Sequence, residues 1–208
     1  MTPMAEVAVK VPKERRQRDV SRAASRTAIL DAARRVAKRE GARDLSLRGV
    51  AAEAGFAPAA LYGYFRNKDE LLLALATDDL TALARVMRGT GGLHGGGLAG
   101  VGTAALDLLR GAETMAAASA VLTASAPHEN HKVGDAERLF NGRLIAALKA
   151  LSDASGLPSN SRQSQCDVVL VAAALAGMAL LARSGRLEAL GFSRDEIIAR
   201  LDARFRNV

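Results

Sequence analysis

The chain has 208 residues, of which 49% are hydrophobic and only 3% aromatic. This length and apolar content indicate one or two globular domains and exclude a disordered chain. A core with so few aromatic residues must consist mainly of Ala, Leu and Val, which favours α-helices over β-sheets. The single cysteine, Cys166, excludes an internal disulfide framework and a cysteine-only zinc site, and it fits a reducing cytoplasm.

Positive charge is concentrated in the first third of the chain. Residues 1–70 hold 15 of the 29 basic side chains but only 9 of the 22 acidic ones. Such a distribution indicates that the N-terminal part meets a polyanion, although a solvated basic tail is the alternative interpretation. Basic residues from Lys10 onward leave no room for the apolar region of a secretory signal. The longest apolar run, residues 168–182, is too short for a membrane span, so it predicts a buried helix and no membrane partner.

The first predicted elements are an arm and a helix. Residues 1–20 contain two prolines and many charges without periodicity, which predicts a flexible basic arm. The folded part is expected to start near Ser21. From Thr27 onward apolar residues recur at helical spacing, and Gly41 stands where a helix typically ends.

Two short helices are predicted next. Ser46 is suited to cap the start of the first, and Gly55 marks its end. Pro58, which is common in the first turn of a helix, opens the second, which runs to Phe65. Two short helices joined by a tight glycine turn form a helix-turn-helix.

A longer helix is expected to follow, because Asn67 and Glu70 form a capping box in front of a leucine-rich stretch that ends near Arg88. The glycine-dense residues 89–102 predict a mobile linker or loop. No alternating strand pattern is present, so the fold class is all-α. Further helices are predicted over residues 103–109, 113–125, 134–153, 164–183 and 193–205. The predicted domains are the arm (1–20), the helix-turn-helix domain (21–68) and a larger helical domain (69–208).

Three motifs follow one another in the helix-turn-helix segment. They are Val-Ala-x-x-Ala-Gly at residues 50–55, Leu-Tyr-x-Tyr-Phe at 61–65 and Asn-Lys-x-Glu-Leu at 67–71. Together they resemble the signature of the tetracycline-repressor (TetR) family of bacterial transcription regulators, over about residues 27–75. The resemblance implies a cytoplasmic, nucleoid-associated homodimer whose N-terminal domains bind double-stranded DNA at an inverted repeat. It also implies a C-terminal domain that dimerises and binds a small-molecule effector. Regulators of this family are most often repressors.

The resemblance assigns roles to single residues. It implies that Leu61 and Phe65 pack in the small domain's core, that Tyr62 and Tyr64 face the DNA, and that Lys68 contacts a phosphate. The start of a helix also favours a phosphate at Lys68 on physical grounds, through free N–H groups and the helix dipole. The predicted DNA-binding residues are Arg26, Ser46, Arg48, Ala57, Pro58, Ala59, Ala60, Tyr62, Tyr64 and Lys68.

Three departures from the family pattern weaken direct base reading. Ala57 lacks the side-chain cap that is typically worth ~1 kcal/mol, Ala60 lacks a hydroxyl, and Gly63 replaces a larger polar residue. Residues 56–65 offer no Arg, Asn or Gln for bidentate base contacts. We therefore expect base recognition to be divided among several weaker contacts. They come from Arg48, from the tyrosine hydroxyls and from Ala59 or Ala60 against thymine methyl groups. Arginines of the arm are expected to reach a narrow minor groove.

The dimer and effector surfaces are predicted less directly. Residues 164–183 are rich in alanine and match the place where the family forms its subunit interface, with ordinary intrachain core as the alternative. The interface residues so predicted are Val168, Val171, Leu175 and Met178. An apolar effector pocket would be lined by Met87, Leu106, Leu109, Met115, Leu122, Phe140, Leu144 and Met178, which are equally plausible as packed core.

Other motifs are weaker. The pattern GxGxxG at residues 95–100 follows no strand, so it predicts a glycine-rich linker and not a dinucleotide site. His128 and His131 have the spacing for a shared metal ion but lie in a stretch typical of a solvated loop. Cys166 is expected to be a small core residue. We expect no cofactor, no metal and no enzymatic activity; the alternative function is a nucleoid protein that coats DNA without sequence preference.

Overall fold

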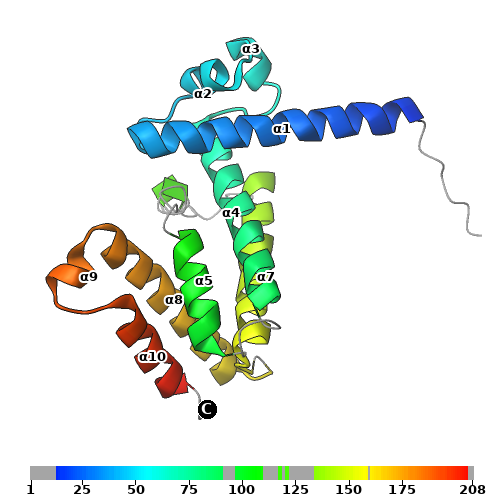
Figure 1. The fold of residues 1–208 in the computed structure, drawn as a ribbon. Helices are drawn as coiled ribbons and strands as arrows, with labels where there is room; N and C mark the ends of the chain where they lie inside the picture. Colours follow the sequence, from blue (N-terminus) through cyan, green and yellow to red (C-terminus); the bar gives the residue numbers. More distant parts are fainter. Residues whose placement is uncertain are drawn as a thin grey trace, which may run out of the picture.

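The computed structural model describes residues 13–90, 97–109, 117–118, 120–121, 134–158 and 160–205. Every regular element in these ranges is a helix, which confirms the predicted all-α class (Figure 1). The helices are α1 (Lys13–Glu40), α2 (Leu47–Ala54), α3 (Pro58–Leu61), α4 (Lys68–Thr90), α5 (Leu98–Leu109), α7 (Asp135–Ser155), α8 (Arg162–Arg183), α9 (Arg186–Ala189) and α10 (Arg194–Phe205).

The molecule has two hydrophobic cores, and α4 contributes to both. The first lies between α1, α2, α3 and the start of α4, where Leu71 and Leu75 are fully buried. The second is formed by the rest of α4 with α5, α7, α8 and α10, and includes Leu80 and Met87. Figure 1 shows α4 running from beneath α1 down along α7 into this larger bundle. The small helix set at the top is therefore fixed to the bundle by a continuous helix.

Helix α1 begins earlier than predicted. It starts at Lys13, whereas residues 1–20 were expected to form a flexible arm. No regular apolar stripe runs along this segment, so apolar periodicity does not reveal it, yet residues 13–18 are all Lys, Glu, Arg or Gln, which are good helix formers. Residues 1–12 of the predicted arm lie outside the described residues.

Both ends of the glycine-dense stretch, which was predicted to be a linker, belong to helices. Gly89 and Thr90 belong to α4, and α5 begins at Leu98. Packing outweighs poor helix propensity here, because Leu98 and Val101 are buried in the larger core. A Cβ atom at Gly102 would lie 3.4 Å from side-chain atoms of both Leu175 and Ile198, so the glycine allows α5 to lie close to α8 and α10.

Helix α8 is buried on one side only, which corrects the expectation of a buried helix. In the described residues it is the one helix long and apolar enough to span a membrane by length and composition, which is weak evidence for a span. Only 28% of its most apolar stretch is buried. Its inner face packs on α5 and α7, while its outer face lies at the surface of the bundle. Cys166 lies on the exposed side, so the prediction of a core cysteine was wrong.

An ion-pair cluster joins the two parts of the molecule where α1 crosses α4. The Arg34 guanidinium donates to Asp78 at 2.5 Å and to Asp79 at 3.1 and 3.2 Å. Partial burial disfavours its charge, but hydrogen bonds and attraction from the two carboxylates outweigh that cost and raise the pKa of Arg34. The cluster fixes the angle at which α4 leaves the small helix set.

A second cluster joins α1 to α2. Glu53 on α2 accepts hydrogen bonds from Arg35 Nε at 2.7 Å and from Arg39 Nη1 at 3.1 Å. These bonds hold the pKa of Glu53 below its ordinary value. Since the pKa is depressed in the folded state, the pair stabilises the fold above the unfolded-state pKa, and this contribution is lost as the pH falls through the folded-state pKa.

We predict that Glu53→Gln lowers the melting temperature at pH 7, because it removes the charge that both arginines hold. The difference from the wild type should shrink on acidification below about pH 4.5 and vanish once Glu53 is protonated in the folded protein. Thermal melts at pH 7 and pH 3 measure it, with Glu188→Gln, an exposed acid on α9, as the control. An equal difference at both pH values would contradict the assignment.

Candidate nucleic-acid interface

Both ends of α2 are built as the sequence predicts. The Ser46 side chain accepts a hydrogen bond from the Gly49 N–H at 3.1 Å and so caps the first turn. At the other end Gly55 takes the left-handed conformation with φ of 71°. The Phe56 N–H donates to the Ala51 carbonyl at 2.9 Å, which completes a Schellman turn. This turn sets the direction in which α3 leaves α2.

Helix α3 is shorter than predicted. It starts with Pro58, and Ala57 provides no side-chain cap. It ends at Leu61, not at Phe65, because the chain tightens into a turn in which the Tyr64 N–H donates to the Leu61 carbonyl at 2.9 Å. Gly63 therefore lies in the turn after the helix, and its low helix propensity does not weaken α3.

The outer face of α3 is small, apolar and accessible. Ala57, Pro58, Ala59 and Ala60 are all exposed, and the Tyr62 side chain follows them at 61% exposure. On the inner side Leu61 and Phe65 are buried, at 0% and 1% exposure, which confirms the predicted core role of both. The face is thus a protruding surface of methyl groups, a proline ring and one phenol hydroxyl.

Tyr64 differs from Tyr62 because its ring is half-buried. Its edge packs against Phe56, with ring centroids 6.4 Å apart and planes at 78°. The Arg22 guanidinium lies over the ring at 5.5 Å from the centroid and donates a hydrogen bond to the Gly63 carbonyl at 2.9 Å. The structure gives the Tyr64 ring a packing role beside the predicted DNA contact.

Arg26 and Lys68 also have partners within the chain. The Arg26 guanidinium lies 5.3 Å from the centroid of the Phe65 ring. The Lys68 ammonium donates to the Arg43 carbonyl and so ties the α1–α2 loop to the start of α4. The predicted capping box is present, with the Glu70 N–H bonded to Asn67 Oδ1 at 2.8 Å. In the return bond the Arg66 N–H donates to Glu70 Oε2, also at 2.8 Å.

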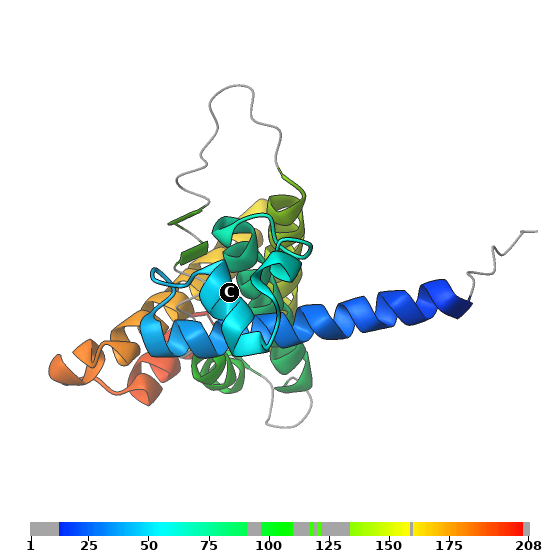
Figure 2. The ribbon, with the colours of Figure 1, turned by 90° about the horizontal axis from the view of Figure 1, so that it is seen from above.

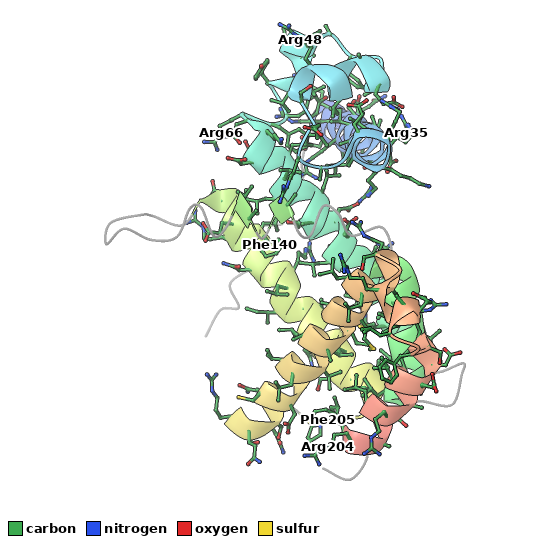
Figure 3. All side chains as sticks on the ribbon, turned by 90° about the vertical axis from the view of Figure 1, so that its left-hand side faces the viewer. Arg35, Arg48, Arg66, Phe140, Arg204 and Phe205 are labelled. Carbon is green, nitrogen blue, oxygen red and sulfur yellow. The ribbon has the colours of Figure 1, made fainter. Side chains whose placement is uncertain are left out.

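Exposed arginines lie on the segments that precede and follow α3. Arg48 on α2 and Arg43 in the preceding loop are exposed, and so is Arg66 after the turn. Figure 3 shows Arg48 at the tip of the molecule, at the opposite end from Arg204 and Phe205. Sequence reasoning identified Arg48 but missed Arg43, in the loop before α2, and Arg66, in the turn after α3. The signal available for them was charge alone.

The arrangement suits a duplex. Arginine side chains around a protruding helix provide phosphate contacts, and the helix between them is narrow enough for the major groove. Arg35 and Arg39 have carboxylate partners in Glu53 and, for Arg39, also in Glu40. Arg66 has a looser ion pair with Glu70, at 3.7 Å. Arg48 is an exposed arginine on α2 itself.

The structure places the predicted dimer residues inside the chain. Val168, Val171, Leu175 and Met178 have exposed fractions of 5% or less and lie in the chain's own larger core. This burial agrees with the alternative interpretation, intrachain packing. The helix is apolar on all sides, so its sequence could not show which face turns inward.

The predicted effector-lining residues divide into two groups. Met87, Leu106, Phe140 and Met178 are buried in the larger core, and Leu144 is half-buried against it. Met115, Leu122 and the Leu109 side chain lie outside the described residues, as do His128, His131 and Gly95–Gly96 of the glycine pattern. In the part of the chain that the structure describes, no group of three His, Cys, Asp or Glu residues could hold a metal ion.

Comparison with known proteins places the helix pair in a family. Residues 29–75 match the model of bacterial regulatory proteins of the tetR family. Over 60 residues the chain is 45% identical to the HTH-type nicotine-responsive transcriptional repressor HdnoR of Paenarthrobacter nicotinovorans, a match that covers 29% of this chain and 31% of that relative. The chain thus spans about a third of the length of that curated relative.

Solved structures share the fold over most of the chain. A transcriptional regulator from Rhodococcus sp. is 21% identical, with a TM-score of 0.60 over 87% of this chain and 95% of that one. The regulator FadR of Bacillus subtilis, solved in complex with stearoyl-CoA, is 18% identical, with a TM-score of 0.55 over 84% of this chain and 94% of that one. At these identities the comparison shows a shared fold and no more.

We predict that Arg48→Ala weakens binding to duplex DNA without changing the melting temperature, because the side chain is exposed at the tip of the helix pair. If it neutralises one phosphate per subunit, the slope of log affinity against log salt falls by about 0.9 for each bound subunit. Fluorescence anisotropy over a salt series measures both effects. The matched control is Arg143→Ala on α7, also exposed; equal losses for the two variants would contradict the assignment.

Proposed function

We propose that the chain is a TetR-family regulator, a homodimeric transcriptional repressor that binds an inverted-repeat operator and leaves it when a small molecule binds, because residues 29–75 match the model of that family. The observation that carries the proposal is the exposed α3 face, held by the Ser46 cap, the Gly55 turn and the buried Leu61 and Phe65. Its site of action is the bacterial cytoplasm, at the nucleoid.

The α3 face favours a particular kind of base reading. Ala59 and Ala60 are suited to contact thymine methyl groups, and the Tyr62 hydroxyl can donate to or accept from a base edge. None of these side chains makes the bidentate contacts that discriminate most strongly, so phosphate contacts by Arg43, Arg48 and Arg66 supply a large part of the affinity. Shape-dependent readout supplies the remaining specificity.

The outer face of α8 supports the dimer. Val169, Leu170 and Leu180 are exposed at 52%, 58% and 62%. Ala173, Ala176 and Gly177 lie between them on the same exposed stripe, so two helices can approach closely along it. An apolar stripe of this length on a helix surface is typical of a partner contact. In this proposal the subunit interface lies on the exposed face of α8, whereas the residues predicted from the sequence lie on its buried face.

Two observations support control by a ligand. The larger core is lined by aliphatic and methionine side chains, which favours an apolar effector. Val121 packs against both cores. A ligand that moves the helices around Val121 would therefore also displace side chains of the DNA-binding part. The fold relative FadR was solved with stearoyl-CoA, and HdnoR is named as nicotine-responsive; both ligands carry apolar parts.

The proposal is tested by selecting bound sequences from a random duplex pool at one salt concentration near physiological. A specific dimer should enrich an inverted repeat with half-sites about 34–36 Å apart, or a multiple of that distance. Binding that is sensitive to salt but enriches no motif would instead favour a protein that coats DNA without sequence preference, which the basic N-terminal region and the modest reading helix also allow.

We predict that Leu180→Glu converts the dimer to a monomer. An unpaired carboxylate buried in an apolar interface costs about 3 kcal/mol or more, which weakens association at least about 100-fold. Sedimentation velocity measures the mass, and the affinity for the selected repeat should fall in parallel. The matched control is Ile145→Glu, because Ile145 is likewise an exposed aliphatic residue, at 68%, but belongs to α7 and not to α8. A Leu180→Glu variant that stays dimeric would exclude this face.

A further inference from the structure

The outer half of α1, residues 13–28, extends beyond the core of the small helix set. Among the described side chains of α1 the first fully buried one is Ile29. The helix has 16 residues before it, or about 24 Å at 1.5 Å per residue. Figures 1 and 2 show this part of the helix projecting to one side, past α2, α3 and α4. We call it the helical arm.

The helical arm is positively charged, and most of its described side chains are exposed. It carries six basic residues and two acidic ones in its sequence. Arg18, Val20 and Ala24 are exposed, with Val20 at 69%. Basic residues near a helix N-terminus are also disfavoured by the helix dipole, which is positive at that end. A polyanion laid along the helical arm would relieve both sources of repulsion.

Two arginines fix the direction that the charged face takes. Arg22 reaches the Gly63 carbonyl and the Tyr64 ring, and Arg26 reaches the Phe65 ring, so this side of α1 turns toward the segment that follows α3. Residues four apart lie on the same face of a helix. Arg18 therefore stands one turn beyond Arg22 on the side of the α3 surface, outside the helix pair.

We propose that the helical arm is a second DNA-binding element, which lies along the phosphate backbone beside the stretch that α3 contacts. This inference rests on the proposed DNA-binding function and extends it to the flanks of the operator. An intact α-helix is about 10–12 Å wide, whereas the minor groove is only about 6 Å wide. The described part of the arm consequently contacts phosphates from outside, which replaces the minor-groove insertion expected from the sequence.

DNA fits the helical arm better than an anionic membrane does. A helix that lies on a bilayer needs a continuous apolar face, whereas the arm has only one large apolar residue, Val20, in its described exposed part. The charged side of the arm also reaches the segment after α3, because Arg22 contacts Gly63 and Tyr64 beside the exposed Tyr62. The same duplex can therefore contact both.

The test uses the full chain and two duplexes, one carrying the selected repeat alone and one with about ten further base pairs on each flank. On the long duplex, Arg18→Gln should reduce the salt slope by about 0.9 per bound subunit. The ratio of wild-type affinity to variant affinity should then fall about 3.5-fold per subunit between 50 and 200 mM salt. On the short duplex the wild type and the variant should bind alike. Arg143→Gln on α7 is the matched control, and circular dichroism checks that helix content is unchanged.

The outcomes separate the two proposals. If Arg18→Gln and the wild type show the same slope on both duplexes while Arg48→Ala reduces it, the helical arm does not contact DNA and the inference fails although the regulator proposal stands. If the wild type prefers no sequence in the selection, the regulator proposal itself fails. A reduced slope on the long duplex only is the result that the helical arm predicts.

Discussion

The structure depends on α4 being shared between two cores. Leu71 and Leu75 close the core of the small helix set, and Leu80 and Met87 enter the larger bundle from the same helix. Arg34 adds a direct connection, because it joins α1 to Asp78 and Asp79 at the point where α4 leaves the small set. The α2–α3 surface is therefore held at a fixed orientation relative to the bundle. Any displacement of α4 by its neighbours in the bundle must carry that surface with it.

This constraint relates DNA binding to the rest of the molecule. The α3 face offers small apolar groups and one exposed phenol, which makes its reading of bases modest, so correct placement of two such faces matters more than the strength of either. An interface along α8 would set the distance between them. In the proposed mechanism a ligand that prefers one arrangement of the bundle would change that distance, and a coupling free energy of about 1–3 kcal/mol is typical of such control. The basic helical arm adds affinity without adding sequence discrimination.

Local chemistry in the sequence predicted the helix-turn-helix well. Ser46, Gly55 and Asn67 each determine a turn or a cap through their own bonds, and all three take the predicted roles. Features set by tertiary packing were not predictable in the same way. Helix α8 is apolar all round, so the choice of Val171 as the inner residue and Leu180 as an outer one depends on its neighbours. The start of α5 among glycines and the continuation of α1 to Lys13 likewise lack a periodic apolar signal.

Hydrogen exchange measured with and without a selected duplex tests the central claim most directly, that the α2–α3 pair and its flanking loops bind DNA as one surface. The account predicts that slowed exchange on DNA binding concentrates in residues 43–66, in the helical arm and at the start of α4, with little change in α7 beyond residue 145. Slowed exchange confined to α5, α7 or α10, with residues 43–66 unaffected, would contradict it.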